Sequence, residues 1–191
     1  RAKTIEEWPL EWCFGNGVVV DIRDLPDGYA LSPRELQDRL KKIGYTLKPK
    51  DIFLAMTGND KLFGKPGYAD HGGHLSADAL AWVLDQGIKT VGTDAWSFDI
   101  GYAHWSKQYK DHGHDPKYLW PCHLLGRKKE YAHYEKLANL EKLPPFGACF
   151  LCVVEVEGMK NLVASCVYPV DNGMVVHTAT ERVRKTRRLN V

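Results

Sequence analysis

Three short apolar segments alternate with two amphipathic segments in the first half of the chain, and this alternation constrains the fold most strongly. Residues 17–23, 51–57 and 90–96 are rich in β-branched and other apolar side chains, as buried strands are. The segments between them repeat apolar residues at helical spacing. Because a β-α-β-α-β order is typical of helices packed on a largely parallel sheet, the sequence predicts an α/β fold.

Local signals mark where the two helices begin and end. Ser32, with Glu35 three residues later, has the pattern of a capping box, and a proline stands at the first helical position. Gly44 follows the last apolar residue of this segment. Ser76 and Gly87 bound the second helix in the same way.

The second half of the chain has weaker patterns. Residues 148–156 and 162–170 read as two strands joined by a short turn, and we expect an antiparallel hairpin on the same sheet or on a second one. Residues 98–145 are rich in aromatic residues and histidine and show no clean periodicity. Because long loops inside a compact domain are usually functional or disordered, and aromatic residues disfavour disorder, we expect the chemistry in this segment.

The chain of 191 residues has the size of one domain and contains no repeat or linker. We therefore predict one domain over residues 1–177 and a basic tail over residues 178–191, which carry five basic residues against one acidic residue. This tail is either a solvated terminus or a surface that binds phosphate, an acidic partner or a membrane surface. The net charge of the whole chain is only +2, so we do not expect it to bind nucleic acid.

The five cysteines are widely spaced and odd in number, which predicts a reducing compartment, and hence the cytoplasm. Cys149 and Cys152 form a C-x-x-C pair inside a predicted strand. Alternate residues of a strand face opposite sides, so this spacing disfavours a shared metal. The longest purely apolar run, residues 149–154, is too short to cross a membrane.

Histidine pairs offer candidate ligands, because imidazole suits Zn²⁺ and Mn²⁺. His71 and His74 lie in a glycine-rich segment, and His112 and His114 precede an Asp-Pro pair. Each pair is interpreted either as metal ligands or as loop histidines at a pocket rim.

Asp94 and Asp99 lie at the C-terminal end of the third predicted strand, where open α/β sheets place their ligand crevice. Asp94 is therefore a pocket candidate, although an aspartate that caps the following turn fits the same pattern.

Several segments resemble the cyclase family of metal-dependent hydrolases, which includes kynurenine formamidase, isatin hydrolase and trans-dienelactone hydrolase. The resemblance runs from about residue 4 to residue 169. It is most specific in GTDAWSFD at residues 92–99 and in EKLANLEKLP at residues 135–144. It implies a compact, layered β/β/α domain of the swivelling type, assembled as a homodimer or homotetramer. The implied reaction is attack of a metal-activated water on an amide, lactam or lactone bond.

The resemblance also implies roles for individual residues. A histidine and a glutamate twelve residues later bind the metal centre of the family, and here they fall on His123 and Glu135, which would hold one or two Zn²⁺ or Mn²⁺ ions. His133, Thr93, Asp94 and Trp96 are weaker candidates for the substrate pocket. The tryptophans and Phe14 either line a pocket for a flat, aromatic or cyclic substrate or pack in the core and interfaces, which the residue types alone do not distinguish (Trp8, Trp12, Trp96, Trp105, Trp120).

One family motif is missing from residues 1–191. The pattern His-x-Gly-Thr-His-x-Asp-x-Pro-x-His supplies the other ligands and a catalytic histidine, and it would fall upstream of residue 1; HGGHLSAD at residues 71–78 only imitates it. We therefore expect no catalytic residue within the chain itself. The alternatives to a hydrolase are a truncated, non-catalytic binding or oligomerisation module, and a binder of acidic partners through the tail.

Overall fold

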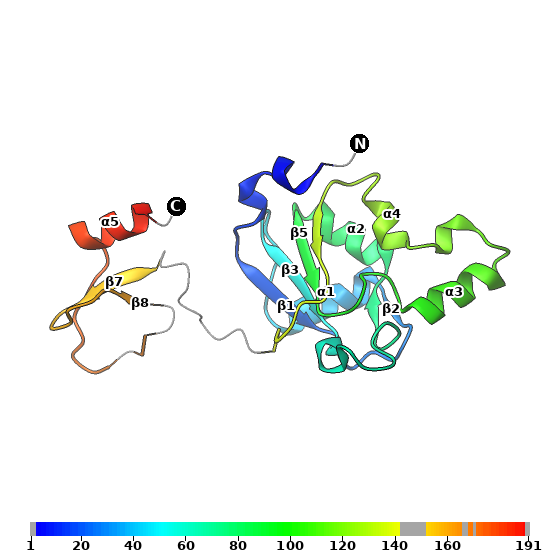
Figure 1. Cartoon of the computed structure of the whole chain (residues 1–191), viewed down its shortest axis with the longest axis horizontal. Helices are drawn as coiled ribbons and strands as arrows, with labels where there is room; N and C mark the ends of the chain where they lie inside the picture. Colours follow the sequence, from blue (N-terminus) through cyan, green and yellow to red (C-terminus); the bar gives the residue numbers. More distant parts are fainter. Residues whose placement is uncertain (1–2, 142–151, 166–167, 170, 190–191) are drawn as a thin grey trace. The chain divides into compact units, whose positions relative to one another are not determined.

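The computed structural model describes residues 3–141, 152–165, 168–169 and 171–189. These residues belong to two compact units, Arg1–Glu141 and Lys142–Val191 (Figure 1). We predicted a boundary at residue 177, whereas the chain divides after Glu141. The basic tail therefore belongs to the second unit.

A four-stranded parallel sheet forms the centre of the first unit, in the order β1-β3-β5-β6. The predicted strands are present as β1 (Gly17–Asp21), β3 (Ile52–Met56) and β5 (Thr90–Thr93). The fourth, β6 (Ala132–Tyr134), lies in the segment that showed no periodicity. The α/β fold predicted from the alternation is confirmed.

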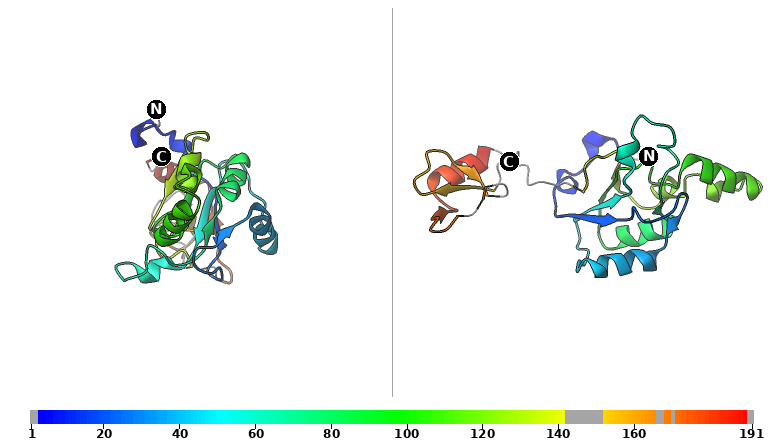
Figure 2. Two further views of the ribbon diagram at one scale, coloured as in Figure 1. Left: turned by 90° about the vertical axis from the view of Figure 1, so that its right-hand side faces the viewer. Right: turned by 90° about the horizontal axis from the view of Figure 1, so that it is seen from below.

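Helices α1 (Pro33–Lys42) and α2 (Ala77–Asp85) pack against one face of this sheet (Figure 2). The capping box of α1 is formed as predicted: the Ser32 hydroxyl accepts from the Glu35 amide, and the Glu35 carboxylate accepts from the Ser32 amide. The Ser76 hydroxyl caps α2 by accepting from the Ala79 amide. A short parallel pair, β2 (Ala30–Leu31) and β4 (His74–Leu75), precedes the two helices.

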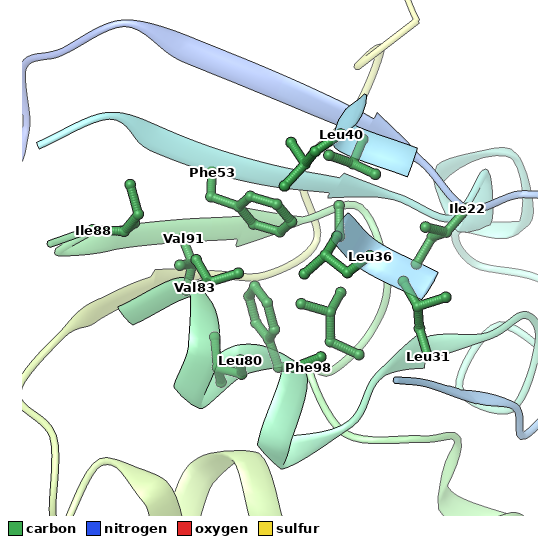
Figure 3. Close-up of a cluster of buried hydrophobic side chains, with 14 of the residues drawn as sticks. Ile22, Leu31, Leu36, Leu40, Phe53, Leu80, Val83, Ile88, Val91 and Phe98 are labelled. Carbon is green, nitrogen blue, oxygen red and sulfur yellow. The ribbon is translucent and has the colours of Figure 1, made fainter. Parts of the chain in front are cut away.

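The core of the first unit lies between the sheet and these helices (Figure 3). Phe53 is paired in register with Val18 on one side and Val91 on the other, so the three side chains share one face of the sheet. Leu36 of α1 and Leu80 of α2 are fully buried in the same cluster as these three side chains. Phe98 belongs to the same cluster and connects it to the residues that follow β5.

The described part of the segment over residues 98–145, which was predicted to be a long loop, contains two helices. It contains α3 (Tyr102–Asp111), a 3₁₀ turn (Pro116–Tyr118) and α4 (Pro121–Leu125) before β6. Trp105 is the one buried residue of α3, which extends away from the sheet in Figure 1. A helix that buries so little of its surface shows no apolar stripe in its sequence, so periodicity did not reveal it. Two further 3₁₀ turns near the start, Ile5–Glu7 and Leu10–Trp12, and one at Asn59–Leu62 complete the first unit.

The second unit contains a three-stranded antiparallel sheet, β8-β7-β9, and one helix. The predicted hairpin is present in its described part as β7 (Val153–Val156) and β8 (Val163–Ala164), on a sheet of its own. Strand β9 (Val176–His177) was not predicted, and residues 148–151, 166–167 and 170 of the expected strands lie outside the described residues.

The basic tail forms α5 (Glu181–Leu189), which packs on β7. Val183 is fully buried, the Arg187 guanidinium donates to the Val153 carbonyl, and Arg182 pairs with Glu155 at 2.9 Å. Part of the basic charge thus stabilises the second unit. Within the described part of the chain, no helix is both long enough and apolar enough to cross a membrane.

Candidate metal centre

The two aspartates that follow β5 have different partners. The Asp94 carboxylate is buried and accepts three hydrogen bonds, from the Thr57 amide at 2.7 Å, the Thr57 hydroxyl at 2.8 Å and the Gly58 amide at 2.7 Å. Asp94 therefore joins the carboxyl ends of β3 and β5. These partners lie 36 and 37 residues earlier in the chain, so the bonds are not the cap of the following turn that the sequence analysis considered.

Asp99 instead holds His123. One Asp99 oxygen accepts from the Cys122 amide at 2.7 Å, and the other lies 2.6 Å from His123 Nδ1. The carboxylate is buried, and its hydrogen bond raises the pKa of His123 against the opposing effect of partial burial. With Nδ1 donating to Asp99, the Nε2 atom of His123 is left to face the site.

Glu135 follows β6 and meets His123 from the other side. Its Oε1 atom lies 3.4 Å from His123 Nε2 and accepts from the Phe98 amide at 3.0 Å. The chain beyond it is anchored because the Lys136 and Leu137 amides donate to the Ala95 and Thr93 carbonyls. The parallel pairing of β6 with β5 thus brings Glu135 next to the segment that follows β5.

His133, on β6, completes the group. Its ring stacks on Phe98 with a centroid distance of 5.8 Å and meets the His123 ring edge to face at 4.9 Å. Burial lowers the pKa of His133, which favours the neutral imidazole that ligates metals. Phe98 therefore connects the hydrophobic core to the site.

One ligand atom each of His123, His133 and Glu135 lies within 4.8 Å of the others. Among the described residues, no other group of three or more histidines, cysteines or carboxylates meets this condition. Two imidazoles and a carboxylate are a donor set that Zn²⁺ and Mn²⁺ accept, and a carboxylate behind a ligating histidine is the usual support. The three residues therefore fit a divalent metal ion.

A cavity of about 170 Å³ opens on this group, lined by Trp96, Ser97, Trp120, His123, Glu135 and Lys136. Of the predicted pocket residues, Trp96 lines the cavity, whereas Thr93 is buried with its hydroxyl bonded to the Ala95 amide.

The other predicted histidine pairs lie elsewhere. His71 pairs with Asp27 at 3.0 Å, and His74 is buried in β4. His112 and His114 contact Tyr118 and Tyr109 through their rings.

Lys136 was not predicted in this cavity, whereas Trp120 was one of the tryptophans for which a pocket and the core or an interface were both considered. Asp99 was placed correctly near the end of a strand, but its partner His123 is 24 residues away in the chain. The predicted histidine-glutamate spacing of twelve pointed to the right region, and His133 lies between the two residues at the start of β6.

Comparison with known families identifies the first unit. The Cyclase family profile matches residues 1–100, more than half of the chain. The chain belongs to the cyclase family.

Solved structures agree with this assignment at the level of the fold. Isatin hydrolase A from Labrenzia aggregata, bound to benzyl benzoate, superposes with a TM-score of 0.58 and 22% identity, over 74% of this chain and 54% of that one. An isatin hydrolase bound to the product analogue thioisatinate gives a TM-score of 0.57 and 21% identity, over 71% of this chain and 52% of that one. This cyclase-family chain thus spans about half the length of the structures it resembles.

A second profile, for a 2Fe-2S iron-sulfur cluster binding domain, matches residues 132–181. Curated relatives include the mitochondrial NADH-ubiquinone oxidoreductase 78 kDa subunit of Candida albicans, 49% identical over 57 residues, which are 30% of this chain and 7% of that protein. An NADH-quinone oxidoreductase subunit of Rickettsia felis is 49% identical over 59 residues, or 31% of this chain and 8% of that protein. The cyclase resemblance that we extended to residue 169 therefore overlaps a likeness to a different family.

The cysteines of the second match do not fit a four-cysteine cluster. Residues 132–181 contain Cys149, Cys152 and Cys166, whereas a [2Fe–2S] cluster is ordinarily held by four cysteines. Cys149 and Cys166 lie outside the described residues. The match begins at Ala132, the first residue of β6, so its first ten residues belong to the cyclase-family unit and supply His133 and Glu135 instead of a cysteine.

Proposed function

We propose that the first unit contributes part of the active site of a metal-dependent hydrolase. This hydrolase would cleave an amide, lactam or lactone bond in a small aromatic or cyclic substrate. The observation that carries this proposal is the group of His123, His133 and Glu135 beside a cavity in a cyclase-family fold. The isatin hydrolases that share the fold support the assignment to C–N bond hydrolysis.

His123 Nε2, a ring nitrogen of His133 and the Glu135 carboxylate would hold one or two Zn²⁺ or Mn²⁺ ions. Such an ion, when bound, lowers the pKa of a water molecule and polarises the carbonyl group that the water attacks. The chain's own contribution is orientation. Asp99 fixes the His123 ring through Nδ1, and the Phe98 amide fixes the Glu135 carboxylate.

The cavity walls contribute the substrate preference. Trp96 and Trp120 present aromatic surface on the same cavity as the two ligands His123 and Glu135. Aromatic side chains favour flat, apolar partners by offset stacking or edge-to-face contact. A small ring with a carbonyl group directed at the ligands matches this arrangement.

Assembly as a homodimer or homotetramer and residence in the cytoplasm remain predictions. The second unit has three cysteines, one fewer than the usual ligand set of a [2Fe–2S] cluster. The alternative function is that of a non-catalytic binding or oligomerisation module, which would have the cyclase fold but would catalyse no reaction.

The test compares Glu135→Gln with Glu130→Gln, a matched control at an exposed carboxylate that pairs with Lys3. Calorimetry with Mn²⁺ and hydrolysis of isatin, used as a lactam probe, are measured on the full chain. We expect Glu135→Gln to lower metal content and hydrolysis together, while Glu130→Gln behaves as wild type. Full hydrolysis or undiminished Mn²⁺ binding by Glu135→Gln would contradict the proposal.

A further inference from the structure

Two residues with unusual backbone geometry line the cavity at the metal centre. The described non-glycine residues with positive φ are Lys50, His114, Trp120, Lys136 and Asn139. Two of them, Trp120 with φ of 49° and Lys136 with φ of 60°, belong to the lining of this one cavity. Bulky side chains adopt this conformation only where the surrounding structure imposes it, and such residues gather at functional sites.

The Lys136 backbone is held in place from both sides. Its amide donates to the Ala95 carbonyl at 2.9 Å, and the amide of the next residue donates to the Thr93 carbonyl at 3.1 Å. Glycine or asparagine would adopt this φ with less strain, so the position carries a lysine at a conformational cost.

The ammonium group of Lys136 lies beside an aromatic wall. Nζ is 5.5 Å from the centre of the Trp96 ring and 4.0 Å from Glu135 Oε2, and the side chain is 45% exposed. The 4.0 Å separation is too long for a hydrogen bond to Glu135. The ammonium group therefore has donors to offer to a ligand in the cavity.

The size and walls of the cavity suit one ring with a small substituent. A cavity of about 150 Å³ is enough for benzene, and this one is about 170 Å³. Trp120 is supported by the Trp105 ring at a centroid distance of 5.6 Å. Trp96 and Trp120 thus offer fixed aromatic surface, and Lys136 is the cation in the lining.

We propose that Lys136 binds the carboxylate of a planar aromatic acid whose ring packs on Trp96 and Trp120. This inference rests on the proposed function, since hydrolysis of an aromatic amide or lactam creates such an acid. Water adds across the C–N bond: the carbonyl carbon gains the hydroxyl group, the nitrogen gains a proton, and the acid then loses its proton to solvent. Lys136 therefore retains the anionic product, or selects a substrate that already carries a carboxylate.

The test uses two probes of the same shape, 2-aminobenzoate and the neutral 2-aminobenzamide. Binding to the full chain is followed by quenching of tryptophan fluorescence, without added metal and again with Mn²⁺. The variants are Lys136→Met, which removes the charge at similar length, and Lys136→Asn, which removes it with a residue that tolerates positive φ. Lys136→Arg restores the charge, and Lys128→Met is the control at an exposed lysine.

We expect the wild-type chain and Lys128→Met to bind the benzoate about tenfold more tightly than the benzamide, as one charge-assisted hydrogen bond allows. Lys136→Met and Lys136→Asn lose this preference but keep the affinity for the benzamide, which also shows that they fold. Lys136→Arg recovers most of the preference for the benzoate.

Equal binding of the two probes by the wild-type chain, binding of neither, or a preference that survives in both neutral variants would overturn the role of Lys136. These results are distinguishable from failure of the proposed function, which is judged by Mn²⁺ binding and isatin hydrolysis. A preference that requires Lys136 in a chain that binds no Mn²⁺ would support Lys136 and contradict the hydrolase.

Discussion

The carboxylate of Asp99 lies 2.6 Å from Nδ1 of His123, so a fully buried anion fixes the one imidazole that faces both Glu135 and the cavity. Asp99 also accepts from the Cys122 amide, which ties the start of α4 to the segment after β5. The position of His123 therefore depends on a contact that spans 24 residues of sequence.

Replacing this carboxylate should weaken metal binding without removing a ligand. In Asp99→Asn the side chain keeps its shape but loses the charge that orients His123, and we expect Mn²⁺ affinity to fall about 10- to 100-fold. Calorimetry of the full chain measures this change. Asp111→Asn, at an exposed carboxylate of α3, is the control, and an unchanged affinity in Asp99→Asn would show that Asp99 does not position His123.

Asp94 should behave in the opposite way, with a loss of stability and no loss of metal affinity. Asp94→Asn replaces an acceptor of three hydrogen bonds with a group that turns an N–H toward donors at Thr57 and Gly58. We expect the free energy of unfolding to fall by about 2–3 kcal/mol in a denaturant titration. A fall in Mn²⁺ affinity comparable to that of Asp99→Asn would instead show that Asp94 supports the metal site.

The buried His74 makes stability depend on pH. Desolvation lowers its pKa from 6.5 to about 4, and its Nδ1 atom has no hydrogen-bond partner; Asp99 and Asp27 raise the pKa and His104 lowers it. Between pH 4 and 6.5 the unfolded chain binds the proton that the folded chain excludes. The contribution of neutral His74 to the free energy of unfolding is therefore complete above pH 6.5, and it is lost as the pH falls to about 4.

We expect the difference in unfolding free energy between wild type and His74→Leu to change by about 3 kcal/mol from pH 7 to pH 4, from the size of this pKa shift. Comparison with the variant isolates His74 from His133, whose pKa is also lowered. His112→Gln, at an exposed histidine, is the control. Parallel pH profiles for wild type and His74→Leu would contradict this account.

Reconstitution of the chain with iron and sulfide tests the second unit. Its three cysteines are one ligand short, so we expect no stoichiometric [2Fe–2S] cluster by visible absorption and iron analysis. A cluster present at one per chain would show that a residue other than these cysteines completes the ligand set.

Local signals predicted the first half of the fold well. The Ser32 and Glu35 capping box and the Ser76 cap lie within four residues of the groups they bond, so the sequence alone identified both helix starts. Strand β6 was missed because its three residues are too few to show an alternating pattern, and its partner β5 lies about 40 residues earlier. Helix α3 was missed because it buries only Trp105.

The candidate site was predicted in part. His123 and Glu135 were assigned through their spacing and the family resemblance, and the structure places them together. The role of Asp99 depends on a tertiary contact, and the positive φ angles of Trp120 and Lys136 follow from no sequence pattern. The likeness of residues 132–181 to an iron-sulfur domain was also missed, because the C-x-x-C pair was judged as part of an isolated strand.

X-ray absorption spectroscopy at the zinc edge, on the full chain with one equivalent of Zn²⁺, tests the central claim most directly. The chain offers two kinds of site, the group of His123, His133 and Glu135 and the five cysteines. We predict nitrogen and oxygen neighbours at about 2.0–2.1 Å, with two imidazole signatures and no sulfur. A sulfur shell at about 2.3 Å would place the zinc on cysteines and contradict the metal centre described for the first unit.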